Sequence, residues 1–97
     1  MTTYVSLLQF TEQGVRNVKD TIKRATAATA DAEKMGVKLK EAFWTMGAYD
    51  LVLLLDAPND DAITTFALKL ASQGNVKTQT MRAFRKEEME SILAKIK

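Results

Sequence analysis

The chain has 97 residues, of which 46% are hydrophobic and 27% are charged. These values are typical of one globular domain over residues 1–97 and exclude a disordered chain. Its net charge of +2 comes from Lys and Arg interleaved with Asp and Glu, a pattern typical of a solvated surface and not of a nucleic-acid-binding face. Because there is no Cys and no His, the chain has no disulfide, no thiol nucleophile, no histidine proton shuttle and none of the usual zinc ligands.

The first third of the chain predicts a strand followed by a helix. Residues 4–10 (YVSLLQF) are apolar and rich in β-forming types, which predicts a strand. A short turn is expected over about residues 12–18, and the main helix is expected from Thr21 behind an Asp20 cap to a stop at Gly36. The apolar stripe of this segment recurs at helical spacing and consists of Val15, Val18, Ile22, Ala25, Ala28, Ala32 and Met35.

A hairpin is predicted to join the second and third strands. Residues 37–46 (VKLKEAFWTM) alternate at their start and carry lysines, as edge strands do. Gly47-Ala48 is short enough for a hairpin turn in which glycine supplies a positive φ, and residues 49–57 follow as the third strand. This strand is apolar in both phases (Leu51, Leu53, Leu55 against Val52, Leu54), which predicts a central position.

The second half repeats the order of elements. Asn59 is expected to cap a second helix, and Gly74 is expected to end it. The buried stripe of this helix is predicted to be Ile63, Phe66, Ala67 and Leu70. Residues 76–84 alternate as a fourth strand. A last helix is marked by Met89, Ile92, Leu93 and Ile96.

This order of elements predicts an α+β, ferredoxin-like βαββαβ fold. The sheet is expected to be four-stranded and antiparallel with strand order 4-1-3-2, with both main helices on one face and a C-terminal helix added. Since the third strand is apolar on both sides, something must cover the second face. The last helix can cover part of it, and the sheet of a second subunit is the economical cover for the rest. We therefore predict a homodimer or higher oligomer.

Four segments of the chain, residues 11–19, 43–50, 57–61 and 74–84, carry a further signal. Together they resemble the GYD domain family of small bacterial and archaeal proteins. The resemblance implies a dimeric α/β-barrel, ferredoxin-like fold and carries no accepted set of catalytic residues. The family's name motif, Gly-x-Tyr-Asp, is met by Gly47, Tyr49 and Asp50. Arg85 stands where a capping Ser or Thr is common, so the last helix is expected to be less well capped.

The predicted topology brings polar residues together along one rim of the sheet. Those expected to gather are Gln13, Gly14, Arg16, Asn17, Trp44, Thr45, Tyr49, Asp50, Asn75 and Lys77. Asp56 and Arg82 are expected toward the opposite rim.

The rim cluster has a structural and a functional interpretation. In the first, Asp50 accepts hydrogen bonds from Arg16, Asn17 or backbone N–H groups and locks the hairpin to the helix entry, while Trp44 and Tyr49 pack. In the second, the rim is a small-molecule pocket in which Arg16 and the Gly14 backbone face an anionic group. Trp44 or Tyr49 then forms an apolar wall, and Asp50 acts as an anchor or base.

Three classes of function compete on these residues. The first is a homo-oligomeric accessory or binding protein without catalysis, whose partners are itself and a small anionic or apolar ligand. The second is a cofactor-independent enzyme similar to the monooxygenases and isomerases of the dimeric α/β-barrel type, which would need a deep apolar cavity with Asp50 or Tyr49 pointing into it. The third, RNA binding, needs aromatic residues on the central strands, and residues 51–55 supply none.

No cofactor, metal or membrane contact is expected. Helix capping and the helix dipole explain Asp56, Asp60 and Asp61 without a metal ion. The start of the chain lacks the basic and apolar regions of a signal peptide, and the longest apolar run is too short to span a bilayer. These features predict a cytoplasmic protein.

Overall fold

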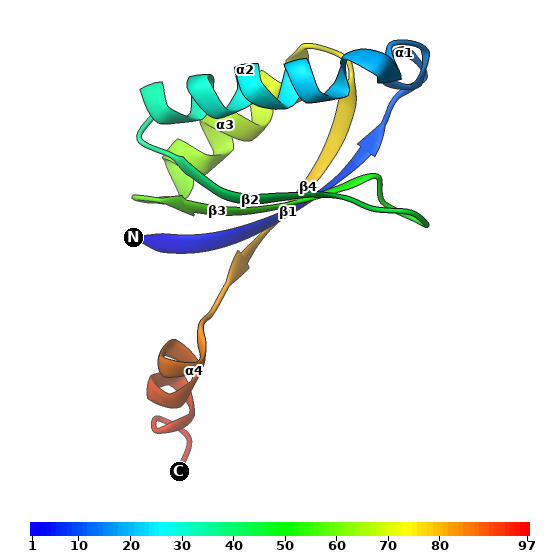
Figure 1. Cartoon of the computed structure of the whole chain (residues 1–97). Helices are drawn as coiled ribbons and strands as arrows, with labels where there is room; N and C mark the ends of the chain where they lie inside the picture. The colour runs from blue at the N-terminus through cyan, green and yellow to red at the C-terminus, as the bar shows by residue number, and fades with distance from the viewer.

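A four-stranded antiparallel sheet is the base of the fold in this computed structural model, which describes all of residues 1–97. The strands are β1 (Thr2–Phe10), β2 (Lys38–Trp44), β3 (Leu51–Ala57) and β4 (Val76–Ala83). Their order, β2-β3-β1-β4, is the predicted order read from the other edge. Helices α2 (Thr21–Lys34) and α3 (Asp60–Ser72) both cover one face of the sheet (Figure 1). The predicted ferredoxin-like fold is confirmed.

The core lies between these two helices and the sheet. Leu51, Leu53 and Leu55 of β3 are buried on the helix side, and Ile63 and Phe66 of α3 pack on them. Full burial of one such side chain stabilises a fold by about 1.5–3 kcal/mol, so this small set supplies much of the driving force. The face that the sequence predicted for α3 is therefore the buried one.

The chain between β1 and α2 forms two short turns that lie beyond the end of the sheet. They are α1 (Glu12–Arg16) and a 3₁₀ turn over Val18–Asp20. The predicted stripe is wrong at its start, because Val15 and Val18 are exposed where no sheet lies beneath them, and Ile22 in the first turn of α2 is exposed as well. Helix α2 begins at Thr21 as predicted, but Asp20 makes no side-chain cap because the 3₁₀ turn runs directly into the helix.

The hairpin between β2 and β3 is longer than the predicted two-residue turn. The backbone N–H of Thr45 donates to the carbonyl of Asp50 at 2.8 Å, so residues 46–49 form the loop. The Thr45 hydroxyl donates to the carbonyl of Tyr49 at 2.7 Å and holds this wider loop. Gly47 has φ +104°, which confirms the predicted positive angle.

The last helix, α4 (Lys86–Leu93), stands away from the body of the domain (Figure 1). None of its residues is buried, so the expectation that it covers part of the open sheet face is wrong. The reason is that β4 stays paired with β1 up to Ala83, and the chain after Ala83 leaves the sheet and carries α4 away from it. Its start is also better capped than predicted, because the Glu88 carboxylate accepts the backbone N–H of Arg85 at 3.0 Å.

Candidate functional site

Asp50 ties the hairpin to the end of β1. Its carboxylate accepts the backbone N–H of Phe10 at 2.8 Å, and its own backbone N–H donates to the carbonyl of Leu8 at 2.8 Å. Nearby, the side-chain amide of Gln9 donates to the carbonyl of Ala48 at 2.8 Å. Of the partners considered for Asp50, the structure therefore places a backbone N–H against it, and neither Arg16 nor Asn17.

The turn that leads into α1 packs closely against Gly74 and Asn75, the two residues that directly precede β4. The N–H of Thr11 donates to the carbonyl of Asn75 at 3.0 Å, and the Thr11 hydroxyl donates to the carbonyl of Gly74. The N–H of Gly14 donates to the Thr11 hydroxyl at 3.1 Å, so it is not free to face an anion. A Cβ atom on Gly14 would lie 2.0 Å from the Asn75 carbonyl oxygen. Glycine is required here by close packing.

Two more predicted residues join this contact, together with one that the sequence did not single out. The amide of Gln13 donates to Asn75 Oδ1 at 3.0 Å, and the amide of Asn17 donates to the carbonyl of Gln13 at 3.1 Å. Arg24 of α2 donates to the carbonyl of Asn17 at 2.6 Å and to that of Gly14 at 3.4 Å. Arg24 lies four residues, or about one helical turn, before Ala28 of the predicted buried stripe. A charged residue on that side of the helix is the signal that could have identified it.

The remaining predicted residues point in different directions. Arg16 pairs with Glu12 on the exposed side of α1. The indole N–H of Trp44 donates to the hydroxyl of Thr21 at 3.0 Å, so this ring lies on the helix side of the sheet. The Tyr49 hydroxyl donates to Gln79 at 2.8 Å on the opposite face. The exposed Lys77 lies at the start of β4. The sheet separates Trp44 from Tyr49, so these two rings, which were alternative candidates for the apolar wall, do not border one common pocket.

A small apolar cavity of about 40 Å³ lies between α2 and the sheet. Its walls are mainly Leu, Ala and Val side chains, and Arg24 is the charged residue at its edge, with the guanidinium 5.9 Å from the centre of the Phe10 ring. Neither Asp50 nor Tyr49 lines it. Sites for metabolites or cofactors usually measure about 300–1,000 Å³. The cavity is thus smaller than the enzyme interpretation requires.

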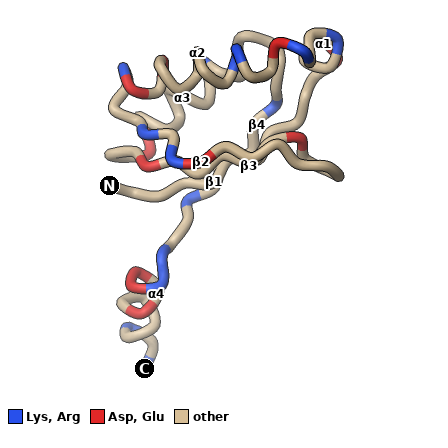
Figure 2. The backbone as a smooth tube through the Cα atoms, in the orientation of Figure 1, with Lys and Arg blue, Asp and Glu red and all other residues tan.

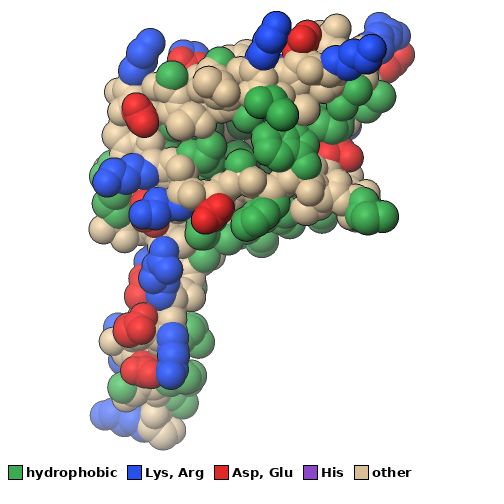
Figure 3. Space-filling view, in the orientation of Figure 1, with side chains coloured by type: hydrophobic (Ala, Val, Ile, Leu, Met, Phe, Trp, Pro, Cys, Tyr) green, Lys and Arg blue, Asp and Glu red, His purple; other side chains and the backbone are tan.

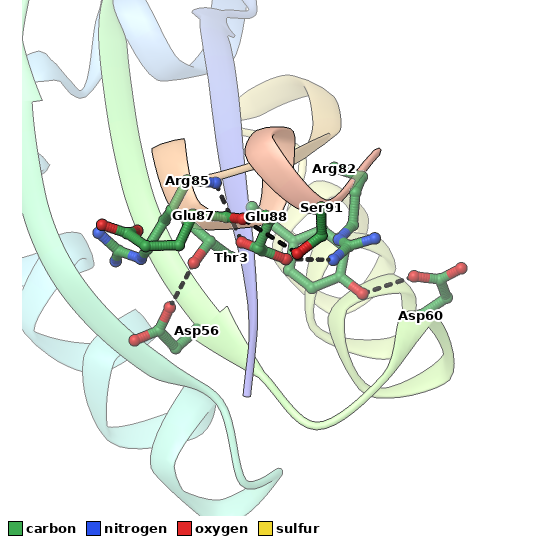
Figure 4. A network of polar contacts seen from close by, with 9 residues as sticks. Thr3, Asp56, Asp60, Arg82, Arg85, Glu87, Glu88 and Ser91 are labelled. Atoms are coloured by element: carbon green, nitrogen blue, oxygen red, sulfur yellow. Dashed lines mark hydrogen bonds and ion pairs between the residues drawn. The ribbon is translucent and has the colours of Figure 1, made fainter. Parts of the chain in front are cut away.

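The opposite rim carries the polar network in Figure 4. The hydroxyl of the buried Tyr4 donates to the Asp60 carboxylate at 2.5 Å, and Thr3 donates to Asp56 at 3.1 Å. The hydrogen bond to Asp60, followed by burial, raises the pKa of Tyr4 above its usual value of 10.0. Tyr4, Asp60 and Arg82 also line a groove of about 390 Å³ between α3 and β4. As predicted, Asp56 and Arg82 lie at this end of the sheet.

The sheet face away from the helices is apolar and uncovered. Its side chains include the half-buried Val5 and Leu7 of β1 and Val52 of β3, whose cross-strand partners Met81 and Phe43 are 42% and 55% exposed. Figure 3 shows hydrophobic side chains along the underside of the sheet and a hollow between sheet and helices. An apolar face of this kind is typical of a protein–protein interface.

Lys, Arg, Asp and Glu residues are scattered along the chain, as Figure 2 shows. In α2 two basic residues near the start are followed by Asp31, Glu33 and Lys34 near the end, while α4 carries a group of glutamates. No cluster of acidic residues is arranged to hold a metal ion. None of the helices combines the length and the apolar character needed to cross a membrane.

Comparisons with known proteins point to one family and to one fold. The family model of the GYD domain matches residues 4–93. A relative from Thermus thermophilus is named "Glutamine synthetase and cystathionine beta-lyase binding protein". It is 29% identical over 84 residues, which cover 86% of this chain and 88% of the relative.

Solved structures with the same fold include two small proteins and a part of a larger one. TTHA0845 from Thermus thermophilus has a TM-score of 0.57 at 22% identity, covering 88% of this chain and 95% of that one. FFRP-DM1 has a TM-score of 0.60 at 22% identity, covering 87% of this chain and 100% of that one. MtbAldR has a TM-score of 0.67 at 9% identity over 88% of this chain, which spans 54% of the MtbAldR chain. At these identities the likeness concerns the fold alone.

Proposed function

The chain belongs to the GYD domain family, and from this membership and its geometry we propose that it is a homodimeric binding protein that has no catalytic activity of its own. We further propose that it acts in the cytoplasm of a bacterial cell. The observation that carries the proposal is the open sheet face, on which Phe43 and Met81 expose large apolar side chains. Exposure of these apolar side chains to water is energetically unfavourable. A second copy of the sheet, packed on the open face, would remove them from water.

The proposed dimer stacks two open sheet faces against each other. Val5, Leu7, Val52 and Leu54 would form the centre of the interface, because they are the half-buried apolar residues of the two central strands. Packed sheets lie about 10 Å apart, a spacing that side chains of this size fill. A closed interface of this kind would need no ligand to hold it.

The proposed partners outside the dimer are proteins. The Thermus relative carries in its name the binding of two enzymes, and by analogy we propose an enzyme of nitrogen or sulfur amino-acid metabolism as the partner of this chain. The small-ligand role at the predicted rim has less support, since the cavity of about 40 Å³ accepts only a few atoms. The groove of about 390 Å³ lies at the opposite rim and contains none of the predicted ligand-binding residues. The enzyme alternative is disfavoured by the position of Asp50, whose carboxylate accepts a backbone N–H outside the cavity.

Light scattering during gel filtration at micromolar concentration tests the dimer. We expect twice the chain mass of 10.8 kDa, and a mass of one chain would contradict the proposal. Native mass spectrometry of the protein purified from its own host then reports whether a small ligand remains bound. For the protein partner, calorimetric titration with the host's purified glutamine synthetase should give saturable binding. Absence of heat and of co-elution at tens of micromolar would reject that partner.

A further inference from the structure

Helix α4 presents an apolar stripe that its own chain leaves exposed. Met89, Ile92 and Leu93 of α4 and Ile96 just beyond its end recur at helical spacing; Ile92 is half-buried, and Leu93 and Ile96 are 54% and 72% exposed. Figure 3 shows hydrophobic side chains gathered on one side of this arm. An isolated helix of eight residues is not stable in water, so its stability must come from packing against another surface.

The arm is nevertheless held in a defined direction. The Glu88 carboxylate accepts two hydrogen bonds, one from the guanidinium of Arg82 at 2.9 Å and one from the backbone N–H of Arg85 at 3.0 Å (Figure 4). Arg82 in turn stacks on Phe84, with 4.4 Å between the guanidinium and the ring centre. Because Arg82 belongs to β4, these contacts fix the start of α4 relative to the sheet. The arm leaves on the side of the open face, away from α2 and α3 (Figure 1).

A second copy seated on the open face would therefore lie beside the arm. Two identical sheets can stack around a twofold axis in two simple ways. With the axis along the strands, β4 of one copy lies over β2 of the other. With the axis across the strands, β4 lies over β4 of the other copy and its end faces the start of that strand.

Charge complementarity distinguishes the two arrangements. The end of β4 and the start of β2 lie at the same rim, as the row of cross-strand partners Ala83, Thr3, Asp56 and Lys38 shows. In the first arrangement the glutamates of α4 thus meet the exposed Lys38 and Lys40, of which Lys40 also lies 4.0 Å from the Asp56 carboxylate of its own chain. In the second they would meet the start of β4, where the exposed lysine is Lys77.

We propose that α4 is an exchanged arm, which packs its apolar stripe beside the start of β2 of a second copy. Glu87 and Glu90 then lie opposite Lys38 and Lys40 of that copy. The proposal rests on the proposed dimer and adds to it a reciprocal clasp, since each copy supplies one arm and receives one.

Cysteine cross-linking tests the arm directly, because the natural chain contains no cysteine. The variant carrying Glu90→Cys and Lys38→Cys should form a disulfide-linked dimer on mild oxidation, since a disulfide requires Cα atoms within about 7 Å. The product should run at twice 10.8 kDa on a non-reducing gel. The matched control carries Glu90→Cys with Lys23→Cys, which places the second thiol on exposed α2, and it should stay a single chain.

The outcomes distinguish failure of the exchanged-arm proposal from failure of the dimer proposal. If both variants are dimers by light scattering but cross-link equally, the arm proposal is overturned and the dimer stands. A disulfide within one chain, which leaves the mass of a monomer, likewise places the arm on its own sheet and overturns the exchange. A monomeric mass before oxidation overturns both proposals.

Charge reversal provides a second, independent measurement. Glu90→Lys should raise the dimer dissociation constant by about threefold, and adding Lys38→Glu in the same chain should restore it. Both residues are exposed, so the fold should be unaffected. If the second change weakens the dimer further, these two charges do not face each other and the proposed placement is rejected.

Discussion

The carboxylate of Asp50 accepts the backbone N–H of Phe10 at 2.8 Å, although forty positions separate the two residues in the chain. This bond closes the end of β1 at the point where the strand passes into α1. It also ties the hairpin loop, which holds the family motif, to the centre of the sheet. The role that the structure supports for Asp50 is that of a brace.

Loss of this brace should destabilise the fold. Asp50→Ala leaves a half-buried N–H of Phe10 without its acceptor, and we expect the free energy of unfolding to fall by about 1–3 kcal/mol. Asp50→Asn keeps an acceptor oxygen and should lose less. Urea unfolding followed by circular dichroism measures both variants. The control, Glu33→Ala on the exposed side of α2, should stay within about 0.5 kcal/mol of the natural protein. Equal stability of Asp50→Ala and the natural protein would remove the bracing role.

Gly14 should tolerate no side chain. In Gly14→Ala the new Cβ would lie 2.0 Å from the Asn75 carbonyl oxygen, so α1 must move away from β4. Such overpacking costs about 1–3 kcal/mol or more, because backbone atoms and not flexible side chains have to yield. A thermal melt should show the loss. Gly47→Ala is the comparison, since its Cβ would meet open space and the variant loses only about 1 kcal/mol from its positive φ. A smaller loss at Gly14 than at Gly47 would contradict the packing argument.

The Tyr4–Asp60 hydrogen bond should make stability fall at alkaline pH. The pKa of Tyr4 is raised in the folded chain, first by the hydrogen bond to Asp60 and then by burial. Its contribution is therefore fully present below the unfolded value of about 10, and it is lost as the pH rises through the folded value. Urea unfolding between pH 8 and 11 measures this slope. In Tyr4→Phe the alkaline loss should shrink, whereas Tyr49→Phe should keep it. An unchanged slope in Tyr4→Phe would assign the loss to another group.

The open sheet face should control the oligomeric state. Phe43→Ser removes a large side chain that is 55% exposed in the single chain, so the monomer loses little by the change. The dimer loses apolar contact, and we expect its dissociation constant to rise by about tenfold or more. Sedimentation or light scattering across a dilution series reports this constant. Ile22→Ser, at an exposed position on α2 away from the sheet, is the control and should leave the constant unchanged.

Much of the local structure follows from the sequence. The strand and helix order, the central place of β3, the Asn59 cap on Ala62 and the helix stop at Gly36 were predicted and are present. These features depend on periodicity and on residues within a few positions of each other. Side chains alternate between the two faces of every strand and return to one face of a helix every three to four residues. The same sequence patterns therefore mark strands and helices in any fold.

The candidate site could be predicted only as a neighbourhood. Topology alone places the strand ends at one rim, which brought Gln13, Gly14 and Asn75 together as expected. It does not say toward which face a side chain points, and so Trp44 and Tyr49, alternative candidates for one apolar wall, lie on opposite faces of the sheet. The register in which the strands pair decides which face of the sheet a side chain occupies, and a shift by one residue would exchange the two faces.

What remained for the tertiary structure to decide was the set of contacts between distant residues and the direction of the C-terminal arm. The bonds from Tyr4 to Asp60 and from Phe10 to Asp50 span 56 and 40 positions, and Arg82, which is paired with Tyr4 in the sheet, holds Glu88 of α4. The sequence by itself determined which segments are strands and helices and that one sheet face lacks a cover. Only the packed chain showed that α4 does not supply this cover, because the chain leaves the sheet after Ala83 and carries α4 away from its own domain.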